Sequence, residues 1–158
     1  MAKLKVYVDT SIFGGVYDEE DPRRIQITET LLDILRLRIG CIPYISNIVI
    51  EEIEKAPHEI KVGLKRGLAD TGSRILNETP ECIGLINEYI RRRIIPARFR
   101  DDARHIAVAV INGIDAIITW NCRHMANIDK KRAINEVNIK MGYKQIDIVT
   151  PMEVVEND

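Results

Sequence analysis

The sequence predicts a three-layer α/β/α domain with a central sheet that is mainly parallel. Short β-branched segments alternate with longer helical segments from end to end, which is typical of a parallel sheet covered on both faces. Aromatic residues make up only 5% of the chain, so Ile, Val and Leu must fill the core. The hydrophobic content of 46% is ample for one such core.

Turn and cap residues separate the predicted elements of the first half. Pro22 marks a helix start, because proline is favoured in the first turn, and Gly40 stops that helix. Ser46 or Asn47 can cap a second helix, which Pro57 ends. The predicted elements are therefore a strand at 4–8, a loop at 14–21, a helix at 22–38, a strand at 41–45 and a helix at 47–56.

The second half continues the alternation. Pro80 begins a helix that Pro96 closes, and Asp101 and Asp102 open another, with Asp101 as the expected cap. Gly142 stops the last predicted helix. The predicted elements are helices at 58–69, 80–94, 101–112 and 129–141, and strands at 74–76, 114–119 and 146–149.

Length and composition limit the class of protein. The 158 residues suit one domain, expected over 1–155, with a frayed tail at 156–158. A net charge of −1 means that nucleic-acid binding would need a local basic patch. Three cysteines, no signal peptide and no membrane-spanning run indicate reduced thiols and a cytoplasmic location.

Four polar side chains stand where a predicted strand ends or a helix begins. They are Asp9, Glu52, Asp102 and Asn121. In a parallel sheet these junctions meet at one edge, the carboxyl end of the strands. Carboxylates gathered there repel one another unless a cation neutralises them, and oxygen ligands suit Mg²⁺ or Mn²⁺. The pattern therefore points to metal-assisted phosphodiester chemistry.

Each acid also has a simpler interpretation. Asp9 and the Asp101–Asp102 pair could serve only as turn or cap residues, and Glu52 could be a charge at a helix boundary. Helical spacing nevertheless places Glu52 on the apolar side, whereas Glu51 is expected to face solvent and to pair with Lys55. An acid on an apolar face favours function for Glu52.

Neighbouring residues are candidates for supporting roles. The hydroxyls of Thr10, Ser11 and Thr119 could hold a carboxylate or a metal-bound water. His105 could be a metal ligand, but such a histidine is more often a packed, hydrogen-bonded neighbour. His124 could reach a phosphate, with Trp120 packing beside the turn.

One basic stretch stands out in an otherwise balanced chain. It is either a solvated helix face or a grip for an RNA backbone next to the acids. Its members are Arg91, Arg92, Arg93, Arg98, Arg100 and Arg104. A third class of function, a small-molecule nucleotide binder, is disfavoured because the chain has no glycine-rich phosphate loop.

In order and spacing, these segments resemble the PIN domain, and specifically VapC-type toxins. The resemblance covers nearly the whole chain and rests on the segments 8–11, 46–53, 102–107, 119–121 and 148–151. It implies a Mg²⁺- or Mn²⁺-dependent endoribonuclease in which Asp9, Glu52 and Asp102 hold the metal and Asn121 supports it. The implied partners are RNA, a cognate antitoxin and a second copy of the chain. The alternative is a catalytically weak nucleic-acid-binding module, because His124 stands where many relatives carry a fourth acid.

Overall fold

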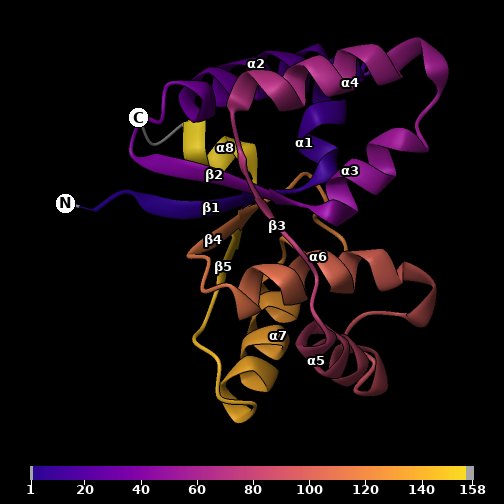
Figure 1. Cartoon of the computed structure of the whole chain (residues 1–158), viewed down its shortest axis with the longest axis vertical. Coiled ribbons are helices and arrows are strands. Elements are labelled where there is room, and N and C mark those ends of the chain that lie inside the picture. The colour runs from indigo at the N-terminus through magenta and orange to yellow at the C-terminus, as the bar shows by residue number, and fades with distance from the viewer. Residues whose placement is uncertain (1, 156–158) are drawn as a thin grey trace.

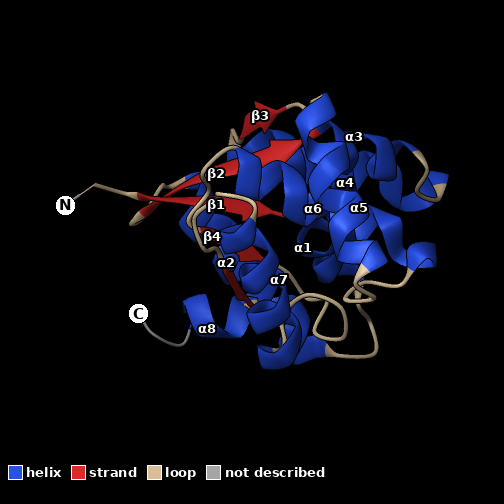
Figure 2. Cartoon of the chain, turned by 90° about the horizontal axis from the view of Figure 1, so that it is seen from below, coloured by secondary structure: helices blue, strands red, loops and turns tan. Residues whose placement is uncertain are grey.

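The computed structural model describes residues 2–155 and contains a five-stranded sheet in the order β3-β2-β1-β4-β5. Every neighbouring pair is parallel, and helices cover both faces (Figures 1 and 2). The predicted fold class is thereby confirmed. The strands are β1 (Leu4–Val8), β2 (Cys41–Ser46), β3 (Arg74–Leu76), β4 (Ala116–Ile118) and β5 (Asp147–Val149).

The helices form two layers. In Figure 1, α2, α4 and α8 lie on one side of the sheet, and α5, α6 and α7 lie on the other. The α-helices are α1 (Thr10–Gly14), α2 (Pro22–Arg36), α3 (Asn47–Glu54), α4 (His58–Thr71), α5 (Pro80–Arg91), α6 (Arg100–Ile111), α7 (Ile128–Lys140) and α8 (Pro151–Val155). Among the described residues, no helix is long and apolar enough to cross a membrane.

The loop predicted at 14–21 is partly helical: its first four residues belong to the end of α1 and to a 3₁₀ turn, whereas 18–21 is a loop as predicted. Asp9 caps α1, because its carboxylate accepts the backbone N–H of Ser11, and α1 runs into a 3₁₀ turn at Gly15–Tyr17. Gly15 is required by close packing, since a Cβ atom there would lie 2.6 Å from Thr28 Oγ1. Gly15, one of the two glycines that suggested a loop, therefore reflects a tight approach of α2.

Two helices end earlier than predicted. α2 stops at Arg36 and α5 at Arg91, because Arg38 and Arg93 adopt left-handed backbone with φ of 53° and 58°. The isoleucine that follows each arginine donates its backbone N–H to a carbonyl oxygen five residues earlier. Ile94, for example, donates to Tyr89 O at 3.0 Å. Arg92 and Arg93 therefore belong to a helix cap rather than to a helix face.

Two other expectations about helices were wrong, and one was right. Phe99, not Asp101, precedes the first turn of α6, and Asp101 lies inside that turn. The short helix α8 follows β5, where only a strand end was predicted. Ser46 does cap α3, through its Oγ and the N–H of Ile48 at 3.1 Å. The predicted tail at 156–158 lies outside the described residues.

Candidate active site

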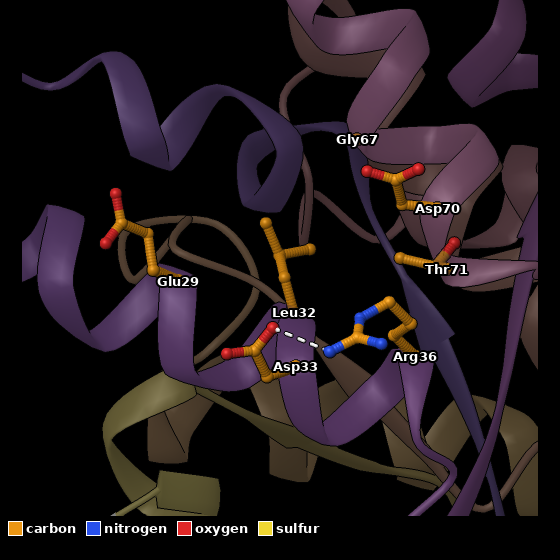
Figure 3. A pocket seen from close by; sticks show the side chains of 7 residues that line it. All are labelled: Glu29, Leu32, Asp33, Arg36, Gly67, Asp70 and Thr71. Carbon is orange, nitrogen blue, oxygen red and sulfur yellow. Dashed lines mark hydrogen bonds and ion pairs between the residues drawn. The ribbon is translucent and has the colours of Figure 1, made fainter.

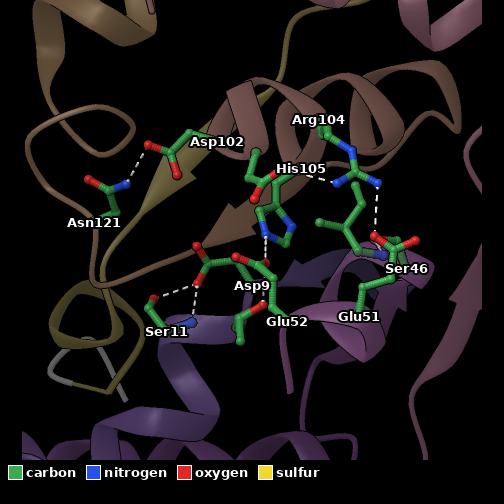
Figure 4. A network of polar contacts seen from close by, with 12 residues as sticks. Asp9, Ser11, Ser46, Glu51, Glu52, Asp102, Arg104, His105 and Asn121 are labelled. Atoms are coloured by element: carbon green, nitrogen blue, oxygen red, sulfur yellow. Dashed lines mark hydrogen bonds and ion pairs between the residues drawn. The ribbon is translucent and has the colours of Figure 1, made fainter. Parts of the chain in front are cut away.

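The carboxyl edge of the sheet gathers the predicted polar residues. Asp9 follows β1, the central strand, and its neighbours β2 and β4 lead into α3 and into the turn at Asn121. Glu52 lies on α3, and Asp102 lies in the first turn of α6. Figure 4 shows Asp9 beside Glu52, with Asp102 and Asn121 facing them from α6 and the β4 turn.

Asp9 is buried, with 5% of its surface exposed, and three hydroxyl or backbone groups hold its carboxylate. Ser11 donates to Oδ1 from its N–H at 3.1 Å and from its Oγ at 2.5 Å. Thr119 Oγ1 donates to Oδ2 at 2.8 Å. Ser11 in α1 and Thr119, which directly follows β4, therefore fix the same carboxylate from two sides.

Glu52 is held by one hydroxyl and one imidazole. Thr10 Oγ1 donates to its Oε1 at 2.8 Å, and His105 Nε2 lies 2.5 Å from the same oxygen. The other ring nitrogen of His105 lies 2.6 Å from the Tyr7 hydroxyl, which lies 2.7 Å from Ser46 Oγ. His105 therefore links Glu52 to the buried core rather than standing free as a ligand.

Asp102 pairs with the turn after β4. Asn121 Nδ2 donates to Asp102 Oδ2 at 3.1 Å, and Asn121 Oδ1 accepts the N–H of His124 at 3.1 Å. Thr119 Oγ1 also accepts the N–H of Asn121 at 3.0 Å, so Thr119 serves both Asp9 and this turn. The turn thus holds both aspartates through Thr119 and Asn121.

His124 packs on the ring of Phe99. The two rings lie 4.1 Å apart between centroids at 31°, and the guanidinium carbon of Arg98 lies 5.0 Å from the Phe99 centroid. His124 Nδ1 is buried and has no hydrogen-bond partner among the described residues. Trp120 instead donates from its ring N–H to Thr28 at 3.0 Å.

Burial and mutual repulsion oppose ionisation of the two aspartates. Burial raises the pKa of Asp9, and the charge of Glu52 adds to this rise. Burial also raises the pKa of Asp102, and the charge of Asp9 adds to that rise. Although burial opposes the shift, hydrogen bonding and charge from His105 lower the pKa of Glu52. A cation at this edge would stabilise the charged aspartates.

Arg104 is engaged by acids of the protein itself. Its guanidinium forms two hydrogen bonds to Glu78, at 2.5 and 3.0 Å, and one each to Asp101 and Glu51 at 3.0 Å. Glu51 therefore pairs with Arg104, not with Lys55 as predicted. Since these contacts occupy the fork of the guanidinium, Arg104 ties α3 to α6 and has fewer donors left for RNA.

The other predicted RNA contacts lie at the end of α5. Arg91 and Arg92 both bind Glu88, at 2.8 and 3.0 Å, and are exposed. Arg93 is exposed in the left-handed cap. The structure does not bring these three arginines into contact with the acids.

The oxygen-rich edge fits a hydrated hard cation better than a closed cage. In residues 2–155, no three His, Cys, Asp or Glu side chains form a group of metal-ligand geometry. Mg²⁺ commonly keeps several waters and takes only one or two carboxylates from the protein. Asp9 and Asp102 supply such oxygens, and Glu52 can act through water because Thr10 and His105 already hold it.

A groove lies between α2 and α4, away from the carboxyl edge of the sheet. Figure 3 shows that Glu29, Asp33 and Arg36 line it from α2, and Asp70 from α4. Arg36 already binds Asp33 at 3.4 Å. Three carboxylates and one paired arginine would repel phosphate, so this groove does not support the nucleotide-binder hypothesis.

These features define a parallel α/β protein with an acidic site at the carboxyl edge of its sheet. Neither a scan of protein-family models nor a search of curated protein sequences gives a match. A chain in the crystal structure of VapBC2 from Rickettsia felis, bound to a DNA fragment from their promoter, aligns with a TM-score of 0.55 at 14% identity. The alignment covers 93% of this chain and 98% of that one.

A second solved structure agrees. A chain of VapBC-5 from Mycobacterium tuberculosis, a member of the VapBC family of toxin-antitoxin systems, aligns with a TM-score of 0.52 at 15% identity. The alignment covers 92% of this chain and 98% of that one. The protein therefore shares its fold with chains of two VapBC structures, in agreement with the fold that its sequence predicted.

Three contributors to the site were missed in the sequence. Tyr7 lies two residues before Asp9 and so shares its face of β1, a signal that period-2 spacing contains. The contacts of Phe99 and Glu78 could not be predicted from sequence spacing, because each residue lies in a connecting segment whose path depends on the tertiary structure.

Proposed function

We propose that this protein is a Mg²⁺- or Mn²⁺-dependent endoribonuclease. The observation that carries the proposal is Asp9, a buried carboxylate on the central strand, which lies within electrostatic reach of both Glu52 and Asp102. Each acid comes from a different element, and each is oriented by its own hydrogen bonds. Concentrating negative charge in this way costs stability, and binding a divalent cation would offset that cost.

The residues have distinct roles in this proposal. Asp9 and Asp102 would hold the cation directly, and Glu52 would hold it directly or through a bound water. Glu52 would also orient the water that attacks the phosphate. Asn121 keeps Asp102 in place, and Ser11 and Thr119 keep Asp9 in place. A divalent cation supplies charge neutralisation at the scissile phosphate and lowers the pKa of water.

Cleavage of single-stranded and structured RNAs by the purified protein tests the proposal. We expect cleavage with Mg²⁺ or Mn²⁺, none with EDTA, and none in Asp9→Asn. A matched control is Asp33→Asn, because Asp33 lies on α2 in the groove of Figure 3, away from the site. Metal-independent cleavage that persists in Asp9→Asn would point to a contaminating nuclease and count against the proposal.

The alternative is a catalytically weak PIN module that binds nucleic acid. It is favoured by the lack of a three-ligand group in residues 2–155 and by His124 at the position where many PIN domains carry another acid. RNA binding without cleavage in either metal would select this alternative.

We further propose that the protein is the toxin of a toxin–antitoxin pair. The support is the fold, which it shares with chains of two VapBC structures. The partners proposed with this role are RNA, an antitoxin protein and a second copy of the chain. A short adjacent reading frame whose product relieves growth arrest caused by this protein would support the role, and growth without arrest would oppose it.

A further inference from the structure

A continuous chain of hydrogen bonds runs from the core to Glu52. It begins at the N–H of Ile48, which donates to Ser46 Oγ, and continues through the Tyr7 hydroxyl and the His105 ring to Glu52. The four donor–acceptor distances are 3.1, 2.7, 2.6 and 2.5 Å. The chain thus joins β1, β2 and α6 to the acid on α3.

The polar groups of this chain are almost fully excluded from water. Tyr7 and Ser46 are 0% exposed, and His105 is 3% exposed. Burying hydroxyl and imidazole groups has a desolvation cost that an apolar core would avoid. The surroundings are apolar: Ile48 and Ile106 are also fully buried here. Glu52 is the one residue of this hydrogen-bond chain that is partly exposed. A functional role of Glu52 would explain why the protein retains these buried polar groups.

The chain stays complete in either protonation state of His105. When the ring is neutral, Tyr7 can donate to Nδ1 and accept from Ser46. When the ring carries both protons, Tyr7 can accept from Nδ1 and donate to Ser46. Because the Tyr7 hydroxyl serves as donor or acceptor, Nε2 of His105 can face Glu52 in both cases. An edge-on contact of the Tyr7 and His105 rings, 5.7 Å between centroids, also limits ring rotation.

We infer that Tyr7 and His105 are positioning residues that fix the Glu52 carboxylate for the reaction. Tyr7 orients the His105 ring, and His105 aligns Glu52 opposite the Thr10 hydroxyl, so the carboxylate keeps one orientation toward Asp9. The inference rests on the proposed nuclease function and adds two residues to it. Partners of this kind typically change metal affinity or activity by about 10- to 100-fold when removed.

Tyr7→Phe is the sharpest test, because it removes one oxygen atom and keeps the ring. Ser46 is less suitable, since it also caps α3. We expect the single-turnover rate of RNA cleavage in Mn²⁺ to fall about 10- to 100-fold, with KM unchanged. His105→Gln should give a similar loss. In the His105→Gln background, Tyr7→Phe should cause no further loss, because its effect passes through His105.

Tyr89→Phe is the matched control. Tyr89 is also 0% exposed, and its hydroxyl donates to Asn138, but it joins α5 to α7 away from the acids. It should lose comparable thermal stability and keep its cleavage rate. Equal rate losses in Tyr7→Phe and Tyr89→Phe, or additive losses in the Tyr7–His105 double variant, would overturn the inference.

A readout without RNA separates this inference from the nuclease proposal. Long-range ¹H–¹⁵N NMR spectra report the ring nitrogens of His58, His105 and His124. Tyr7→Phe should move the Nδ1 signal of His105 and leave those of the other two rings in place, while Tyr89→Phe should move none of them. If the His105 signal does not move, the inference fails even when the wild type cleaves RNA. If it moves but the wild type cleaves nothing, the nuclease proposal fails instead.

Discussion

Asn121 uses both ends of its amide to join Asp102 to the turn that follows β4. Its Nδ2 donates to Asp102 at 3.1 Å, and its Oδ1 accepts the N–H of His124 at 3.1 Å. Since a backbone N–H can only donate, the oxygen must face His124, and the nitrogen must face Asp102. Asn121 therefore orients an acid, and its oxygen is already engaged within the turn.

Asp9→Asn, Glu52→Gln and Asp102→Asn should each reduce metal-dependent RNA cleavage by more than about 100-fold, because loss of a ligand exceeds the effect typical of outer partners. Circular dichroism should show an unchanged fold, since each replacement is nearly isosteric. Cleavage assays in Mn²⁺ check this expectation. A variant with wild-type cleavage would remove that residue from the site.

The control for Glu52→Gln needs an acid on the same helix. Glu51→Gln is expected to be nearly silent in cleavage, although its pairing with Arg104 means that it can lower stability slightly. Glu54→Gln is cleaner, because the ion pairs of Glu54 run to two lysines of α4, Lys61 and Lys65.

Stabilisation by Mn²⁺ should depend on pH. Because the pKa values of Asp9 and Asp102 are raised in the folded protein, the folded apo protein binds protons more tightly than the unfolded chain. These two groups therefore favour folding as the pH falls through their raised pKa values. Protons and Mn²⁺ compete for the same carboxylates, so the rise in Tm caused by Mn²⁺ should shrink as the pH falls through these raised pKa values. This loss should begin above pH about 4, where an ordinary Asp titrates.

Thermal unfolding with and without Mn²⁺ across a pH series checks this. The lowered pKa of Glu52 has the opposite sign, since its stabilisation is lost only as pH falls through a value below the ordinary one. A Tm increment that stays constant down to pH about 4 would contradict the raised pKa values. In Asp9→Asn the increment should be small at every pH.

Neutralising Arg91, Arg92 and Arg93 together should weaken RNA binding and leave Mn²⁺ affinity unchanged. If all three contact phosphates, the salt dependence of log K should become shallower by about 2 for single-stranded RNA. Glu88→Gln should have the opposite effect on RNA binding. It removes the acid that pairs with Arg91 and Arg92, so it should strengthen binding. Titrations at several salt concentrations measure both, and an unchanged slope in both variants means a solvated surface.

His124 should influence the choice of metal. Mn²⁺ accepts nitrogen more readily than Mg²⁺ does, so we expect faster cleavage with Mn²⁺, and His124→Asp should shift the preference toward Mg²⁺. His124 Nδ1 is buried and has no hydrogen-bond partner within residues 2–155, so it is available to a metal ion. Cleavage rates in both metals decide the matter. An unchanged ratio in His124→Asp would leave His124 as a packing partner of Phe99.

The parts of the fold that periodicity controls were predictable, and the parts that long-range packing controls were not. All five strands and the parallel pairing follow from β-branched runs between helical segments. The helix α1 was missed because Gly14 and Gly15 signal a turn locally, whereas the close approach of Thr28 explains Gly15. The ends of α2 and α5 were overestimated because arginines rarely adopt the left-handed backbone seen at Arg38 and Arg93.

The site was predictable at the level of strand ends and not at the level of contacts. The placement of Asp9, Glu52 and Asp102 at one edge follows from topology alone. The partner of Glu51 could not be inferred, because Arg104 reaches it from another helix, 53 positions away. The Lys55 prediction considered only neighbours on the same helix.

The central place of β1 also sets when the site can exist. β1 pairs with β4 from Val6↔Ala116 to Val8↔Ile118, and Thr119 reaches Asp9 across 110 positions. A growing chain on the ribosome therefore carries Asp9 and Glu52 long before Thr119 and Asn121 emerge. Pairing between such distant segments is slow to form. If the chain is a nuclease as proposed, products that end before Thr119 lack groups that hold Asp9 and Asp102, and we expect them to be inactive toward RNA.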